Sequence, residues 1–185
     1  MDRQQRLRIA LQKSGRLTDE SLDLLHRCGL KFNRGKDQLM CYGENMPLDV
    51  LFVRDDDIPD LVQEDVCDLG LVGLNVLEEK RLAMLARGTT PHIEILQKLD
   101  FGRCRLSLAV PQEFVFEGLP SIAGKRIATT YPHVLARFLR ENAITAEIVT
   151  LSGAVEIAPR LGRADLICDL VSTGSTLTAN HLREV

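Results

Sequence analysis

Short apolar runs alternate with helix-type patterns along the chain, and this alternation predicts an α/β fold with parallel strands. The first run, residues 7–11, is typical of a short buried strand, and apolar positions at helical spacing follow it between residues 17 and 28. Further strands are expected over residues 49–53, 68–73, 93–99, 105–110, 126–130, 148–151 and 166–168. Helices are expected after residue 57, over residues 75–80 and 134–139, after Gly153 and from about Thr176.

These elements fall into two similar blocks, which predicts two α/β lobes that meet somewhere within residues 90–104. We assign residues 1–95 to the first lobe and residues 96–180 to the second. A cleft between two lobes is a common place for a small ligand, so we expect the ligand site there.

The composition is that of a globular protein, because 45% of the 185 residues are apolar and 26% are charged. The net charge of -3 and the absence of Trp argue against a nucleic-acid-binding surface. No signal-peptide-like or bilayer-spanning apolar stretch is present, so we expect a cytoplasmic protein without a membrane partner. The five cysteines form no CxxC pair and the four histidines lack metal-ligand spacing, so a zinc site is not expected.

The segment with the most chemical information is residues 164–177, where an apolar run leads to Asp169 and then to a turn rich in hydroxyl groups. The carboxylate could accept hydrogen bonds from ribose hydroxyls. Residues 172–176 could hold a phosphate through N–H groups, hydroxyls and the positive end of a helix dipole. The alternative is a plain capped turn with Ser172 or Thr173 as N-cap. The order of strand, acid, hydroxyl turn and helix favours phosphate binding.

Three other charged segments carry weaker signals. Lys13 and Arg16 could hold a triphosphate or pyrophosphate, but such a loop taken alone is more typical of a solvated surface. The acidic triplet Asp55–Asp57 could bind Mg²⁺, but it is more typical of an acidic first turn of a helix. Glu156 could bind a metal or a hydroxyl group, although a lone acid is more often a surface residue. Serine-hydrolase, P-loop and dinucleotide-binding motifs do not occur.

Eight segments, taken together and in order, resemble the ATP phosphoribosyltransferase family, which catalyses the first step of histidine biosynthesis. They extend from near residue 6 to the end of the chain and read LQKSGRL (11–17), ENMP (44–47), VRDDDIP (53–59), DLGLVG (68–73), LDFG (99–102), RIATTYP (126–132), GAVEIAP (153–159) and DLVSTGST (169–176). The resemblance is greatest to the long-chain bacterial branch of the family.

The resemblance implies that ATP and phosphoribosyl pyrophosphate react, with Mg²⁺, to give phosphoribosyl-ATP and pyrophosphate. It implies attack of adenine N1 on the anomeric carbon of ribose, no covalent nucleophile, and two lobes similar to type II periplasmic binding proteins. The residues implied for phosphoribosyl pyrophosphate binding are Asp169, Leu170, Val171, Ser172, Thr173, Gly174, Ser175 and Thr176. Those implied for the ATP or pyrophosphate side are Lys13, Gly15, Arg16, Arg54, Asp68, Gly70, Tyr131 and Glu156.

Long-chain members of the family continue beyond the point where this chain stops, so we interpret the sequence as a truncated form. The resemblance implies that residues 181–185 begin a return to the first lobe, and that a regulatory domain binding histidine as a feedback inhibitor would follow. A homo-oligomer, dimer or hexamer, is expected for the full-length protein. Two alternatives remain open: a non-catalytic two-lobed module for a small anion or nucleotide, and an adenylate-binding regulatory subunit without chemistry.

Overall fold

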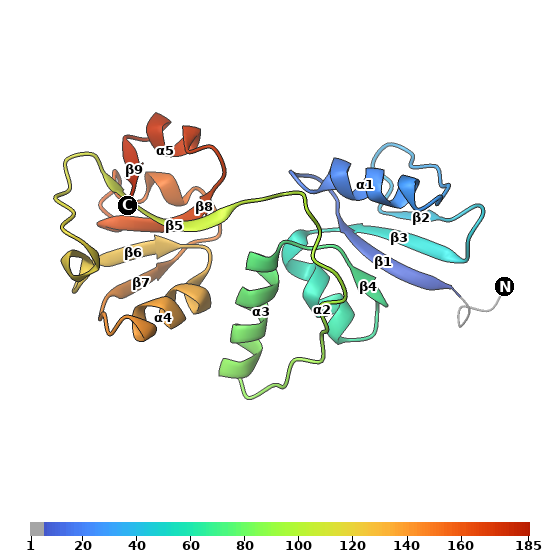
Figure 1. Ribbon diagram of the computed structural model, residues 1–185, viewed down its shortest axis with the longest axis horizontal. Helices are drawn as coiled ribbons and strands as arrows, with labels where there is room; N and C mark the ends of the chain where they lie inside the picture. The colour runs from blue at the N-terminus through green and yellow to red at the C-terminus, as the bar shows by residue number, and fades with distance from the viewer. Residues whose placement is uncertain (1–5) are drawn as a thin grey trace. The chain divides into compact units, whose positions relative to one another are not determined.

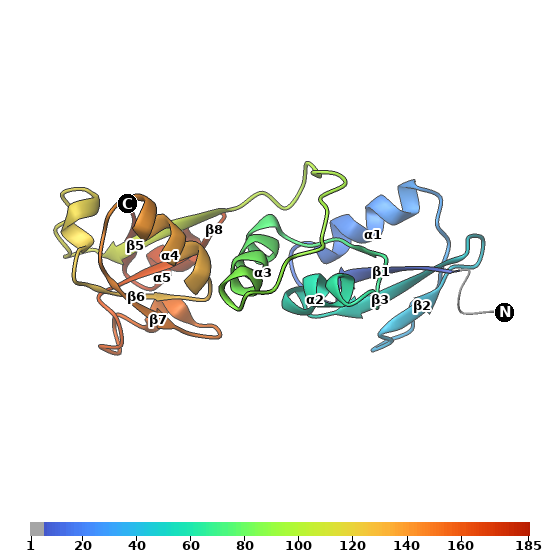
Figure 2. The ribbon, with the colours of Figure 1, turned by 90° about the horizontal axis from the view of Figure 1, so that it is seen from below.

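The computed structural model describes residues 6–185, and the chain divides into two compact units, Met1–Gly102 and Arg103–Val185 (Figures 1 and 2). The first unit contains β1 (Leu7–Gln12), α1 (Thr18–Arg27), β2 (Met40–Tyr42), β3 (Leu48–Val53), the 3-10 turn η2 (Asp55–Asp57), α2 (Ile58–Gln63), β4 (Leu69–Gly70) and α3 (Leu74–Ala86). The second contains β5 (Arg105–Pro111), η3 (Leu119–Ile122), β6 (Arg126–Thr129), α4 (Pro132–Glu141), β7 (Glu147–Thr150), η4 (Val155–Ile157), β8 (Leu166–Val171), α5 (Ser175–Ala179) and β9 (Leu182–Glu184).

The first unit is built on a four-stranded sheet in the order β2-β3-β1-β4. β1 runs parallel to β3 and β4, whereas β2 pairs with β3 in the antiparallel direction. Alternate residues of β1 face opposite sides of the sheet. Leu11 packs with Leu25 of α1 in one cluster, and Ala10 packs with Ile58 of α2 in another. The sheet is therefore covered on both faces, as its almost continuous apolar strands require.

The second unit has a five-stranded mixed sheet in the order β7-β6-β8-β5-β9. β6 runs parallel to both β7 and β8, and β5 runs antiparallel to β8 and β9. One face packs Ile127 of β6 against Leu135 of α4. The other packs Ile167 of β8 against Leu177 of α5. Figure 1 shows α4 and α5 on opposite faces of this sheet.

The α/β class expected from the sequence is confirmed, but three expected elements differ. Residues 93–99 form no strand although their apolar pattern predicts one, because within the described part of the chain no neighbouring strand pairs with them. The strand expected over residues 68–73 is reduced to Leu69–Gly70, and the helix expected after Gly153 is the single 3-10 turn η4.

The division into units also differs from the boundary assigned between residues 95 and 96, since it falls between Gly102 and Arg103. Residues 181–185, expected to begin a return to the first lobe, belong to the second unit. There, β9 pairs with β5, with Leu182 opposite Pro111, and Leu182 is buried in the core of the second unit. This edge strand gains main-chain hydrogen bonds from its sheet.

All five cysteines are free thiols, and three of them, Cys41, Cys67 and Cys168, are buried. Burial raises the pKa of the Cys41 and Cys67 thiols, which keeps both protonated at neutral pH. Between residues 6 and 185, no helix has both the length and the apolar character needed to cross a bilayer.

Candidate functional site

The carboxyl ends of three neighbouring parallel strands meet at one edge of the second sheet. Tyr131 follows β6, Glu156 follows β7, and Ser172–Ser175 follow β8. Because β6 is parallel to both of its neighbours, these three segments leave the sheet on the same side. Open α/β sheets bind ligands at this edge. The structure thus gathers the predicted phosphoribosyl pyrophosphate residues, together with Tyr131 and Glu156, at the carboxyl edge of the second sheet.

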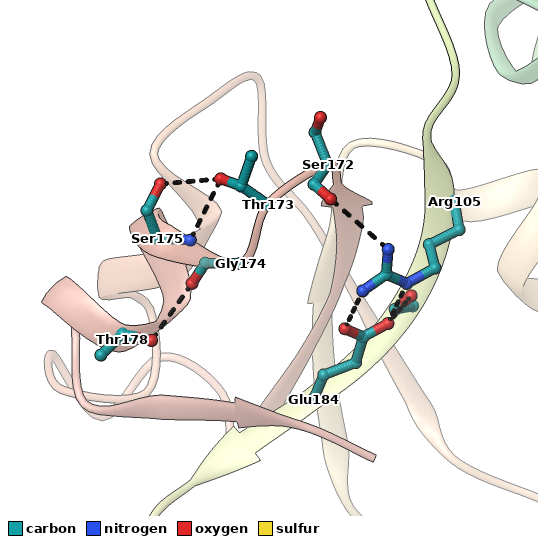
Figure 3. Close-up of polar contacts among 8 residues, drawn as sticks. Arg105, Ser172, Thr173, Gly174, Ser175, Thr178 and Glu184 are labelled. Atoms are coloured by element: carbon teal, nitrogen blue, oxygen red, sulfur yellow. Dashed lines mark hydrogen bonds and ion pairs between the residues drawn. The ribbon is translucent and has the colours of Figure 1, made fainter.

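Residues 172–175, which we call the hydroxyl turn, are joined by local hydrogen bonds (Figure 3). The hydroxyls of Thr173 and Ser175 lie 3.0 Å apart, and the Ser175 N–H donates to Thr173 Oγ1 at 3.4 Å. Gly174 has a φ of +80°, and a Cβ at this position would meet no atom within 4 Å. The turn therefore exposes three hydroxyl-bearing residues, Ser172, Thr173 and Ser175, around an open glycine.

Asp169 does not lie in the turn but in β8, because this strand continues beyond the expected residues 166–168 to Val171. Its carboxylate is half-buried and accepts the Leu170 N–H at 2.8 Å. Asp169 is registered opposite Ser107 of β5. Val171 packs in the core with Leu177. The predicted run of eight residues is therefore part strand, which anchors it, and part exposed turn.

The helix that follows the hydroxyl turn, α5, has only five residues, Ser175–Ala179. Its macrodipole is correspondingly small, so the contribution expected from the helix dipole is minor. The first bond from its main chain is the Thr178 N–H to the Gly174 carbonyl at 3.1 Å. By helix geometry the N–H groups before Thr178 have no carbonyl partner inside the helix, and that of Ser175 donates to Thr173 Oγ1 instead.

An ion pair missed by the sequence reasoning lies beside the hydroxyl turn (Figure 3). The guanidinium of Arg105 on β5 donates two hydrogen bonds to the carboxylate of Glu184 on β9, and its Nη1 lies 3.5 Å from the Ser172 carbonyl oxygen. Ser107 Oγ also donates to Glu184, at 2.7 Å. These hydrogen bonds lower the pKa of the Glu184 carboxyl, and the Glu184 carboxylate raises the pKa of Arg105. No local motif marks this pair, since its members lie 79 residues apart.

In the first unit, the predicted basic residues Lys13 and Arg16 follow the carboxyl end of β1. Lys13 extends the pairing of β1 by donating its N–H to the Val53 carbonyl at 2.7 Å. Lys13 and Arg16 are exposed, and within residues 6–185 neither forms an ion pair with a carboxylate. Gly15 has a φ of +128°, a conformation that side chains rarely allow. Two exposed cationic side chains without a carboxylate partner among residues 6–185 thus lie at the carboxyl edge of the first sheet.

Three other residues predicted for the ATP side have structural roles here. Arg54 holds both carboxylate oxygens of Asp56 at 3.0 Å. Asp68 precedes β4 and accepts the Arg8 N–H at 2.7 Å, at the amino end of β1. Lys13 lies roughly 16 Å further along the strand at about 3.3 Å per residue, so Asp68 is not near it. A Cβ on Gly70 would approach Ile58 Cγ2 to 2.5 Å, so close packing explains this glycine.

Tyr131 and Glu156 are positioned by the starts of their own elements. The Tyr131 N–H donates to Thr129 Oγ1 at 2.9 Å, and its carbonyl accepts the Leu135 N–H at 3.0 Å in the first turn of α4. Ala154 precedes η4 with a φ of +49°. Tyr131 and Glu156 are both partly exposed. The structure assigns them no chemical role beyond their place at the strand ends.

The described residues contain no cluster of three or more His, Cys, Asp or Glu side chains that could hold a metal ion. The acidic triplet does not form one, because Asp56 is already paired with Arg54 and the three residues form the turn η2. Among residues 6–185, the side chains therefore offer no resident metal site of three or more ligands.

A hollow of about 580 Å³ lies on the first sheet, lined in part by Arg6, Arg8, Tyr42 and Asp49. Arg6 is paired with Asp49 at 2.7 Å, and Arg8 donates to the Val66 carbonyl at 3.0 Å. No predicted site residue lines it. Arg6 is neutralised by Asp49, and the hollow lies away from the predicted site residues, so we do not take it as the candidate site.

The comparisons with solved structures establish the fold. The chain is 31% identical to the ATP phosphoribosyl transferase (HisG:HisZ) complex from Thermotoga maritima, with a TM-score of 0.75, covering 97% of this chain and 81% of that chain. The alkanesulfonate-binding protein SsuA from Xanthomonas axonopodis pv. citri is 17% identical with a TM-score of 0.55, over 97% of this chain and 60% of that one. Arginine-bound ArgBP from T. maritima is 13% identical with a TM-score of 0.57, over 98% and 81%. The chain has the two-lobed α/β fold of these binding proteins.

A family model, HisG: ATP phosphoribosyltransferase, matches residues 54–185. This match is longer than half of the chain and contains the strand, the acid and the hydroxyl turn of the second unit. The chain therefore belongs to the ATP phosphoribosyltransferase family.

Proposed function

We propose that this chain transfers the phosphoribosyl group of phosphoribosyl pyrophosphate to N1 of ATP, releasing pyrophosphate, as the first step of histidine biosynthesis. The observation that carries the proposal is the family match over residues 54–185, within which the hydroxyl turn lies at the carboxyl edge of parallel strands. A ribose phosphate needs a cradle for the phosphate and an acceptor for its hydroxyls. The hydroxyl turn and Asp169 supply these two functions.

Binding of the 5-phosphate would rest on the hydroxyls of Ser172, Thr173 and Ser175 and on the N–H groups at the start of α5. An oxyanion bound by several hydrogen bonds from fixed donors gains both affinity and orientation. The open space around Gly174 lets a phosphate approach the main chain closely. Asp169, on the strand that delivers this turn, would accept hydrogen bonds from the ribose hydroxyls.

The reaction needs no nucleophile from the protein. Adenine N1 forms a bond to the anomeric carbon while the bond from that carbon to the pyrophosphate oxygen breaks, and the electron pair leaves with pyrophosphate. Catalysis then depends on holding the two substrates in line and on stabilising the departing charge. We assign Lys13, Gly15 and Arg16 to the ATP or pyrophosphate side, because the two exposed cations have no carboxylate partner among residues 6–185.

Mg²⁺ enters this proposal with the substrate phosphates. Magnesium is commonly held by one or two carboxylates together with substrate phosphates and water, and not by a cage of protein side chains. This agrees with the lack of a three-ligand cluster among the described residues. We further propose a cytoplasmic homo-oligomer, dimer or hexamer, inhibited by histidine in its full-length form. The Thermotoga maritima relative, whose structure is of a HisG:HisZ complex, makes a second protein chain a further candidate partner.

The proposal is tested by calorimetric titration of Mg²⁺–phosphoribosyl pyrophosphate into the chain and into Asp169→Asn, with thermal melts of both. Loss of charge-assisted hydrogen bonds to ribose should weaken binding by about 1.5–3 kcal/mol and leave ATP affinity unchanged. An unchanged sugar-phosphate affinity in the variant would remove Asp169 from the site. A folded parent that binds no phosphoribosyl pyrophosphate would reject the site itself.

A non-catalytic binding module is the second candidate, favoured by the structural likeness to the sulfonate-binding and arginine-bound proteins. Turnover separates the two. Incubation with ATP, phosphoribosyl pyrophosphate and Mg²⁺ should release pyrophosphate and form phosphoribosyl-ATP in equal amounts. Binding of either ligand without product would favour the module.

A further inference from the structure

The Arg105–Glu184 pair joins three strands at the point where the hydroxyl turn leaves the sheet. Arg105 is registered opposite Val171, the last residue of β8, and the next residue, Ser172, begins the turn. Glu184 is registered opposite Ala109 on the far side of β5. The guanidinium thus spans from β9 to the main chain of the turn. We propose that Arg105 is a positioning residue for the sugar-phosphate site, holding the Ser172 carbonyl while Glu184 fixes its guanidinium; this inference rests on the proposed function.

Without Glu184, Arg105 would have little to restrain it. Its side chain is 57% exposed, and a free arginine on a surface samples many rotamers. The two parallel hydrogen bonds to Glu184 use the planar fork of the guanidinium and fix both its direction and its plane. The hydroxyl of Ser107 in turn orients the carboxylate. The remaining Nη1 donor is then directed at the Ser172 carbonyl.

The same network reaches the acid of the candidate site. Ser107 and Asp169 are registered opposite each other in the antiparallel pair β5–β8, so their side chains share one face of the sheet. Arg105 lies two residues from Ser107 on that strand and therefore faces the same side. The turn and Asp169, which would hold the phosphate and the ribose, are both adjacent to groups ordered by Glu184. The Arg105–Glu184 ion pair can thus fix the position of the hydroxyl turn relative to Asp169.

A matched ion pair lies at the other end of β8 and serves as a control. Arg126 of β6 donates to both carboxylate oxygens of Asp165, at 3.0 Å and 3.4 Å, and to the Gly162 carbonyl at 2.8 Å. Asp165 directly precedes β8, whereas the hydroxyl turn directly follows it. In both pairs, the guanidinium of an arginine donates two hydrogen bonds to a carboxylate and a further one to a main-chain carbonyl, and all three groups belong to the second unit. Only the Arg105 pair contacts the turn.

The experiment compares Arg105→Gln and Glu184→Gln with Arg126→Gln and Asp165→Asn in the 185-residue chain. Titration with Mg²⁺–phosphoribosyl pyrophosphate should give a Kd on the order of tenfold weaker for the first two variants, because a preorganised donor set is loosened. The two control variants should stay within about twofold of the parent. Arg105→Lys keeps the charge but not the fork, so it should bind as weakly as Arg105→Gln.

The Glu184→Gln variant separates positioning from direct contact with phosphate. If Arg105 were itself a phosphate ligand, removing its carboxylate partner would free its charge and strengthen binding. If Arg105 positions the turn, the same change weakens binding. Amide hydrogen exchange in the ligand-free protein adds a readout independent of affinity: exchange over residues 172–178 should be faster in Arg105→Gln and Glu184→Gln, and unchanged in Arg126→Gln.

Several results would overturn the inference. Equal affinities in the Arg105 and Arg126 variants would do so while leaving the parent's binding, and hence the proposed function, intact. Tighter binding by Glu184→Gln would do so as well. A folded parent that binds no phosphoribosyl pyrophosphate would overturn both the inference and the proposed function. If Arg105→Gln lowers the melting temperature, its weaker binding could come from a loss of stability. Arg105→Lys and Glu184→Gln then decide the outcome, through their Kd for Mg²⁺–phosphoribosyl pyrophosphate and their hydrogen exchange over residues 172–178.

Discussion

The loop after β1 and the turn after β8 occupy the same place in their own sheets but are built from different chemistry. Each follows the carboxyl end of a parallel strand, leads into a helix and contains a glycine with positive φ, Gly15 or Gly174. The first loop, residues 13–16, carries Lys13 and Arg16. The hydroxyl turn carries no cation and is instead contacted by Arg105 from a neighbouring strand.

This difference shows two ways of meeting an anion. Long exposed cations can follow a flexible polyphosphate, but they lose rotamer entropy when they bind. Short hydroxyls and main-chain N–H groups lose little entropy and hold one phosphate in one place. The basic loop therefore suits a ligand with several charges, and the hydroxyl turn suits a single phosphate whose position matters for chemistry.

The largest expected effect comes from the two glycines. Gly15→Ala should destabilise the first unit by about 2–3 kcal/mol, chiefly because a φ of +128° is outside the range of ordinary side chains; the new Cβ would also meet Gln12 Nε2 at 2.6 Å, the end of a side chain that can move aside. Gly174→Ala should cost only about 1 kcal/mol, because φ is +80° and the space around it is open. Hydrogen exchange of each unit's core amides measures both losses.

Gln12→Ala is the control that divides the Gly15 effect into its two causes. In the Gln12→Ala/Gly15→Ala double variant the contact with Gln12 is gone and only the backbone strain remains. A double variant as stable as Gln12→Ala alone would show that the backbone at Gly15 is not strained, and the contrast between the two glycines would disappear.

A smaller effect concerns affinity. Arg16→Ala should weaken ATP binding by about tenfold, the scale of one charge-assisted hydrogen bond, and should reduce the dependence of that binding on salt. Phosphoribosyl pyrophosphate binding through the hydroxyl turn should change much less. Arg27→Ala, which removes an exposed arginine paired with Asp23 on α1, is the matched control. An equal loss of affinity for ATP and for phosphoribosyl pyrophosphate in Arg16→Ala would contradict the assignment of ATP to the loop and of the sugar phosphate to the turn.

Much of this architecture could be predicted from local sequence. The hydroxyl turn can be located from the sequence because a buried strand, an acid, hydroxyl residues and a helix start lie in one continuous segment, 164–177. The same applies to the Lys13–Arg16 loop after β1. Where strand, turn and helix are neighbours in the chain, apolar periodicity and turn chemistry are sufficient to locate them.

The features that local sequence does not predict depend on contacts between residues far apart in the chain. Residues 93–99 have a strand pattern, but a strand also needs a partner, and periodicity does not show whether one exists. Gly70 matched a family segment, yet its small size is explained by Ile58 across the packing interface. The Arg105–Glu184 pair has no signal in either local segment, since only the register of β5 with β8 and β9 brings it to the turn.

The smallest expected effect is the response of the second unit to acid. The carboxyl pKa values of Glu184 and Asp165 are lowered from 4.5 and 3.8 by hydrogen bonds from Arg105 and Arg126, and both residues belong to the second unit. A lowered folded-state pKa means that the folded protein binds fewer protons than the unfolded chain around pH 4, so the stabilisation is present at neutral pH and is lost as pH falls below the ordinary carboxyl value.

Because both carboxylates are partly exposed, each should contribute roughly 1 kcal/mol or less. Hydrogen exchange followed from pH 7 towards pH 3, with rates corrected for intrinsic acid and base catalysis, should show this loss in the second unit. Glu184→Gln and Asp165→Asn should each make the pH dependence of that unit shallower and leave the first unit's dependence unchanged. If the parent and both variants follow the same curve in the second unit, neither ion pair is coupled to the stability of that unit.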